Sequence, residues 1–195
     1  MKKWYDPLEC DNIVENPFIA DTVVLKGVEE FELVRGQLIE KWDKSAWFQA
    51  SEPKYDGDPD DVLQNAISPP IYSARLRKAL DNAGVTGIQY LPVHVLRPDG
   101  SPIEGFAIAN ILNLLPALDF EKSDYDVFED DYFLPERRGK VRCIRKPVLR
   151  RTIIEGYDIF RLMEFKQYII VSDRFRNIFV ANGFTGYSFH QVYTS

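Results

Sequence analysis

Few side chains in this sequence have the types and spacing that catalysis requires. The two histidines, His94 and His190, are the natural general bases, and each lies in a stretch of alternating apolar and polar residues that predicts a strand. A serine hydrolase would need one of them beside Ser73 or Ser172, yet both serines stand where the N-cap of a helix is expected. The sequence therefore predicts no catalytic residues.

Metal, cofactor and phosphate sites are not predicted either. Cys10 and Cys143 are single cysteines far apart, without the paired spacing of zinc, redox or disulfide sites. The carboxylates of residues 119–136 lack the glycine and ligand spacing of a calcium loop. Two Gly-x-Thr-Gly runs, at Gly84 and Gly183, follow predicted helices, whereas a phosphate-binding loop precedes one. We expect no metal and no cofactor, and we do not predict an enzyme.

The most unusual charge pattern is an acidic stretch followed directly by a basic one. Residues 119–136 hold eight acidic side chains against Lys122 alone, and residues 137–151 hold eight basic side chains and no acidic one. Aromatic residues lie among the acids, a combination typical of interfaces in which charge steers the partner and rings anchor it. The predicted partner-binding residues are Asp124, Tyr125, Asp126, Phe128, Glu129, Asp130, Asp131, Tyr132 and Phe133, with Asp56 to Asp61 as a second candidate.

Two other interpretations of this pattern remain open. The acidic and basic stretches can pair with each other across a hairpin, which would make them structural. The basic stretch can instead bind nucleic acid, although the net charge of −6 disfavours nucleic acid as a partner of the whole surface.

A second pattern concerns the fold, because one strand-helix-strand unit occurs twice. Residues 71–93 and 170–192 align without a gap, and eight of 23 positions are identical. In each copy a serine caps a short helix with one apolar stripe, and a glycine ends the helix before an alternating strand begins. Each copy also places two arginines in the first helical turn, where they oppose the helix dipole. We interpret these arginines as members of structural ion pairs, with an anion site as the alternative.

The remaining elements indicate an α+β protein with a mixed or largely antiparallel sheet and a few short helices. The sequence predicts strands at 18–25, 31–34, 140–149, 159–164 and 168–171, a helix at 59–66, and a hairpin turning at Asp99-Gly100. We expect a single domain over residues 1–195, in which the β-rich residues 1–60 are a candidate subdomain and residues 61–195 are the main part. No secretory leader or membrane span is predicted, and the expected location is cytoplasmic.

The order of these motifs resembles a bacterial immunity-protein family encoded beside polymorphic toxins, typified by a myxobacterial immunity domain and formerly classed as a domain of unknown function. The resemblance covers roughly residues 30–192. Its motifs include Ile71-Tyr-Ser-x-Arg-Leu, Gly84-x-Thr-Gly, Tyr90-Leu-Pro-Val, Asn110-Ile-Leu-Asn, Leu118-Asp-Phe-Glu-Lys-Ser and Ile170-Val-Ser-x-Arg-Phe.

The resemblance implies a cytoplasmic protein without catalysis that binds and neutralises a cognate toxin, which we expect to present a basic surface. It implies no membrane or nucleic-acid partner. The alternative is a small-ligand or anion-binding protein, or an enzyme, whose site is assembled from distant residues such as the four repeat arginines.

Overall fold

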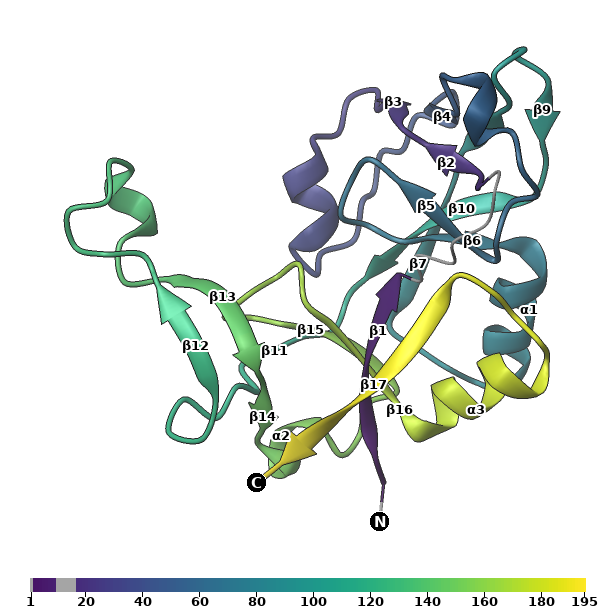
Figure 1. Cartoon of the computed structure of the whole chain (residues 1–195). Helices are drawn as coiled ribbons and strands as arrows, with labels where there is room; N and C mark the ends of the chain where they lie inside the picture. Colours follow the sequence, from purple (N-terminus) through teal and green to yellow (C-terminus); the bar gives the residue numbers. More distant parts are fainter. Residues whose placement is uncertain (1, 10–16) are drawn as a thin grey trace.

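Two antiparallel helices, α1 (Ala74–Asn82) and α3 (Asp173–Ala181), pack against each other beside two extended sheets in the computed structural model of the chain (Figure 1). The structure describes residues 2–9 and 17–195. Cys10 lies outside the described residues. Strands predominate and the helices are short, so the predicted α+β class is confirmed.

The first sheet has the order β2-β5-β6-β10-β7, in which β2 runs parallel to β5 and every other neighbouring pair is antiparallel. Strand β10 carries only buried side chains, because it lies between β6 and β7 and is covered on both faces. The strands are β2 (Ile19–Ala20), β5 (Val62–Asn65), β6 (Ile71–Ser73), β7 (Ile88–Pro92) and β10 (Phe106–Ile111).

The second sheet has the order β11-β15-β16-β1-β17-β14. Its central strand, β1, comes from the beginning of the chain and pairs antiparallel with both β16 and β17, so that Trp4 lies between Ser172 and Val192. The strands are β1 (Trp4–Glu9), β11 (Leu114–Leu115), β14 (Val148–Leu149), β15 (Ile159–Leu162), β16 (Ile169–Ser172) and β17 (Tyr187–Thr194).

Smaller elements complete the described chain. A third sheet has the order β3-β4-β8-β9, and β8 and β9 form the predicted hairpin around Asp99-Gly100. These strands are β3 (Thr22–Val24), β4 (Trp47–Gln49), β8 (His94–Leu96) and β9 (Pro102–Ile103). The short helical segments are α2 (Arg151–Ile154), η1 (Glu30–Val34), η2 (Pro53–Tyr55) and η3 (Pro135–Arg137).

The duplication extends well beyond the aligned residues 71–93 and 170–192. The parallel pair β2-β5 has its counterpart in β11-β15, and β5-β6 has its counterpart in β15-β16. Likewise β4 runs parallel to β8 as β14 runs parallel to the end of β17. We call residues 17–111 the first unit, and residues 114–195 together with β1 the second unit. In the second unit, β1 takes the place that β10 fills in the first.

The repeated serines have the capping roles that the sequence predicts, and two of the four repeat arginines, Arg75 and Arg174, form the predicted ion pairs. The Ser73 and Ser172 hydroxyls each accept a hydrogen bond from a helix amide and donate one to an aspartate, Asp61 or Asp158. Arg75 pairs with the same Asp61 and Arg174 with the same Asp158 (2.8 Å). These hydrogen bonds leave both serines engaged, so neither stands as a free nucleophile.

The arginines also connect the two units reciprocally. Arg75 donates to the Gly183 carbonyl (3.4 Å) at the end of α3, and Arg174 donates to the Ala83 carbonyl at the end of α1. Each guanidinium therefore binds exposed carbonyls at the negative end of the partner helix, which offsets its unfavourable place in its own first turn.

Two predicted elements are wrong. Residues 59–66, predicted as a helix, form a loop and the strand β5. The acidic run that suggested a helix N-terminus instead supplies Asp61, whose buried carboxylate accepts from Ser73, Arg75 and the Thr185 amide. Residues 31–34, predicted as a strand, belong to the 3-10 helix η1, which Glu29 and Glu32 close with a capping box.

Candidate partner-binding arm

The acidic and basic stretches form an antiparallel hairpin that projects from the second unit (Figure 1). We call residues 119–147 the arm. Its strands are β12 (Asp124–Val127) and β13 (Val141–Lys146), and its tip contains η3. The base is fixed to the second sheet because Ser123 and Val148 exchange hydrogen bonds between side chain and backbone. The arm inserts between β11 and β14, where the first unit inserts the segment between β2 and β4.

Two of the predicted binding residues are engaged inside the arm. Asp124 and Asp126 both contact the Arg145 guanidinium at 2.5 Å, and Arg142 lies 3.5 Å from Asp126. The hydrogen bonds from Arg145 hold the pKa of both carboxyl groups below its usual range. The two strands therefore pair through their charges, as one of the open interpretations predicted, and β13 presents part of its positive charge to β12.

This arrangement gives a testable consequence. In Arg145→Met the guanidinium is absent, and the pKa of Asp124 and Asp126 is expected to rise toward the ordinary aspartate value, because the loss of a donor and a positive charge destabilises the ionised form. An NMR titration of the carboxyl carbons measures this directly. Arg138→Met is the control, since Arg138 donates to the Tyr132 carbonyl at the tip. An unchanged pKa in Arg145→Met would contradict the assignment.

The remaining acidic residues of the prediction lie at the tip. Glu129, Asp130 and Asp131 are exposed, and none of them forms an ion pair within the described chain. The arm as a whole holds eight acidic and seven basic side chains, a net charge of −1. Its negative character is therefore local to the tip loop and does not extend over the whole arm.

An aromatic cluster lies beside these acids. Phe128, Tyr132 and Phe133 are stacked in sequence with ring centroids 4.6 Å apart, and Arg137 covers the Phe128 ring. Phe133 ends the stack with 75% of its surface exposed. Nearer the base, the Tyr125 and Phe120 rings pack edge to face. The rings support one another, so Phe133 is held by its neighbours while its outer face remains in contact with solvent.

In the second acidic candidate, Asp56 to Asp61, two of the four aspartates are paired within the described chain. Asp61 is buried as described, and Asp56 forms an ion pair with Arg97 at 2.8 Å. Asp58 is exposed. Asp58 and Asp60 form no ion pair in the described chain, so this segment offers a partner two unpaired acids against the three at the arm tip.

The four repeat arginines do not converge on a common anion. Arg75 and Arg174 bind their aspartates, while Arg77 lies over Tyr90 and Arg176 over Tyr5. In residues 2–9 and 17–195 no three histidine, cysteine, aspartate or glutamate side chains are arranged so that they could hold a metal ion. No helix in the same residues is long and apolar enough to cross a membrane.

Two cavities on the second sheet are not predicted from the sequence, because residues distant along the chain line them. One lies around Asp6, Tyr168 and Tyr187, and the other runs from Asp6 to the base of the arm at Lys146 and Pro147. The pairing of β1 with β16 and β17, and of β14 with β17, brings these residues together, so no local sequence signal could identify them.

Comparison with protein-family models matches residues 15–194 to an immunity protein family (Imm11). A search of curated proteins gives no match. The matched range spans nearly the whole chain, including the first unit, the arm and the second unit apart from β1 and Ser195. The chain belongs to the Imm11 immunity protein family, whose function is immunity to a toxin.

Proposed function

We propose that this protein neutralises its cognate toxin in the cytoplasm by binding it directly, without catalysis, and that the tip of the arm contacts the toxin. The observation that carries the proposal is the exposed Phe133 at the end of the aromatic stack, beside the unpaired acids Glu129, Asp130 and Asp131. A large ring held in place with its face open is typical of an interface anchor.

The unpaired acids favour a toxin with a basic surface. Side chains at the rim of an interface contribute mainly to the rate of association and its dependence on salt. Asp124 and Asp126 are already paired with Arg145, so we assign them to the rigidity of the arm and assign the attraction of the toxin to Glu129, Asp130 and Asp131.

The test uses the cognate toxin domain, which we expect to be encoded beside this gene, with its activity removed by mutation for purification. The double variant D130K/D131K is expected to lower the association rate constant about tenfold or more at low salt, with the difference shrinking as salt rises, because steering depends on unscreened charge. Biolayer interferometry at two salt concentrations measures both effects.

A matched control changes the same number of charges away from the arm. Glu40 and Asp81 are exposed and unpaired in the described chain, so E40K/D81K should associate at nearly the wild-type rate. The proposal fails if the wild-type protein does not bind the neighbouring toxin and gives no protection when the two are co-expressed.

A further inference from the structure

The two units differ most on one face of their sheets. In the first unit, Leu91 and Ile108 are buried in the core that the segment from Phe18 to Ala50 completes. The strand registers place His190 and Asp6 at the equivalent positions of the second unit, because β17 corresponds to β7 and β1 to β10. There His190 is exposed and Asp6 is only partly buried. In the second unit, the segment equivalent to the one that covers this face in the first unit is the arm, residues 119–147, which projects away from the sheet.

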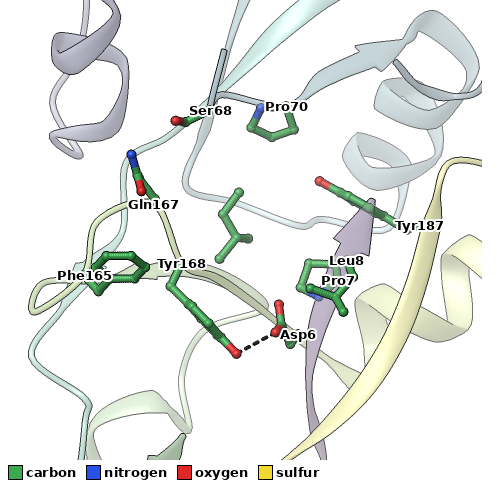
Figure 2. Close-up of a pocket in the computed structure, with 10 residues that line it drawn as sticks. Asp6, Pro7, Leu8, Ser68, Pro70, Phe165, Gln167, Tyr168 and Tyr187 are labelled. Atoms are coloured by element: carbon green, nitrogen blue, oxygen red, sulfur yellow. Dashed lines mark hydrogen bonds between the residues drawn. The ribbon is translucent and has the colours of Figure 1, made fainter. Parts of the chain in front are cut away.

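The uncovered face contains the cavity of about 200 Å³ around Asp6 (Figure 2). Asp6 and Tyr168 lie at one end, where the Tyr168 hydroxyl donates to the Asp6 carboxylate at 2.5 Å, and Ser68 and Pro70 of the first unit lie at the other. The volume is below the roughly 300 Å³ at which small-molecule sites begin, and it suits a single long side chain.

The residues that line the cavity determine which kind of partner side chain can bind in it. Asp6 is the only acidic or basic residue among the described residues that line this cavity, and it forms no salt bridge within the described chain. Residues 10–16, the part of the chain next to β1, contain no lysine, arginine or histidine. Burial raises the pKa of Asp6 despite the Tyr168 hydrogen bond and the nearby His190, so the ionised carboxylate is short of favourable contacts. A partner cation would supply one.

The other walls are mainly apolar and aromatic, with Ser68 and Gln167 as polar members. Leu8 and Ile169 offer apolar surface, and Phe165 and Tyr168 offer rings. Lysine and arginine combine an aliphatic stem with a terminal cation, and the cation binds favourably both to a carboxylate and to an aromatic face. An anionic side chain would meet the Asp6 carboxylate and be repelled.

The cavity also lies within reach of a protein bound to the arm. The neighbouring cavity shares Asp6, Leu8 and Tyr168 with it and continues to Lys146 and Pro147 at the base of the arm. We propose that the toxin inserts one arginine or lysine side chain into the Asp6 cavity, so that the toxin is held between this cavity and the arm. This inference rests on the proposed function and identifies a second contact for the same partner.

The first measurement uses a minimal probe. Butylguanidinium carries the stem and cation of an arginine side chain, and it should shift the methyl NMR signals of Leu8 and Ile169 in the wild-type protein, whereas butanesulfonate, with the same stem and an anion, should not. In Asp6→Asn the guanidinium shifts should disappear. Equal shifts from both probes, no shift from either, or shifts that persist in Asp6→Asn would overturn the assignment.

The second measurement uses the inactivated neighbouring toxin. Asp6→Asn keeps an acceptor for the Tyr168 hydroxyl and should bind at least tenfold more weakly, because it leaves an inserted cation unpaired. The loss should persist in 0.5 M salt, since a buried pair is screened far less than the exposed tip charges. Asp81→Asn on the exposed side of α1 is the matched control and should bind normally.

The outcomes separate the two proposals. If wild-type protein and Asp6→Asn bind the toxin equally, the cavity assignment is wrong and the proposed function stands. If the wild-type protein does not bind the toxin at all, the proposed function fails and the assignment of the cavity to the toxin fails with it. Thermal unfolding checks that Asp6→Asn is folded, and its Tm should equal or exceed that of the wild type, because a desolvated carboxylate has been removed.

Discussion

Alanine in place of Gly186 is expected to lower the free energy of unfolding by about 3 kcal/mol or more. The backbone at Gly186 has φ +100°, a region that residues with a Cβ enter at a cost of about 1–2 kcal/mol. A Cβ there would also lie 2.3 Å from the Val62 carbonyl oxygen and 3.0 Å from the Asp60 Cβ. Because the obstructing atom belongs to the backbone of β5, relief requires the two units to separate locally, which adds about 1–3 kcal/mol.

The same turn supplies the control. Gly183 also has positive φ, at +61°, but nothing lies within 4 Å of its added Cβ. Gly183→Ala should therefore cost only the conformational part, about 1–2 kcal/mol. Urea unfolding of the two variants measures the difference. Equal losses would mean that the contact between Gly186 and β5 does not constrain the junction of the units.

Phe133→Ala is expected to weaken toxin binding by about tenfold or more without altering the stability of the free protein. The ring is largely exposed, so its removal leaves folding nearly unchanged, within about 0.5 kcal/mol. If it anchors the toxin, its loss removes a central apolar contact worth about 1.4 kcal/mol or more. The loss should appear mainly as faster dissociation, in contrast to the slower association expected for D130K/D131K.

Val180→Ala provides the comparison for this variant. Val180 is also a large apolar residue with 56% of its surface exposed, and it lies on α3, away from the arm. It should leave both stability and toxin binding close to the wild-type values. A Phe133→Ala protein with the wild-type dissociation rate would remove the tip from the interface.

The parts of the fold that the sequence predicts are those with a local physical signal. The capping serines and the glycines after each helix locate α1 and α3, because caps and stops act within one helical turn. The Pro-Asp-Gly turn likewise locates the β8-β9 hairpin. The misassigned helix at 59–66 shows the limit, since Asp61 and its neighbours are equally suitable for a helix N-terminus and for a buried acceptor of a distant arginine.

Long-range pairing is the part that the sequence does not predict. The aligned residues gave no indication that β1 and β10 occupy equivalent places, because neither lies within the repeat and they stand at opposite ends of their units along the chain. The sequence also does not predict the burial of Arg161, which has no carboxylate partner among the described residues. Burial lowers its pKa to about 10, and its guanidinium donates to the Lys166 carbonyl at 2.8 Å.

The sequence predicts which acids and rings belong to the candidate arm. It does not predict which of the acids pair inside the arm and which remain unpaired. The sequence marks the acids and rings of residues 124–133 as one surface. The structure divides them, because the two bulges of the hairpin place Arg145 over Asp124 and Asp126 and leave the later acids unpaired at the tip. Which acids are neutralised depends on strand register, and a sequence of alternating charges is compatible with several registers.

The use of β1 as the middle strand of the second sheet sets an order for folding during synthesis. The first unit takes its strands from residues 19–111 and can close while the ribosome is still translating the rest of the chain. The second sheet cannot close until β17 has emerged, so β1 must wait with its edges unpaired through most of translation. We therefore expect an early folding intermediate in which the helix α1 is formed and immunity is absent, and full protection only after the last strand joins the first.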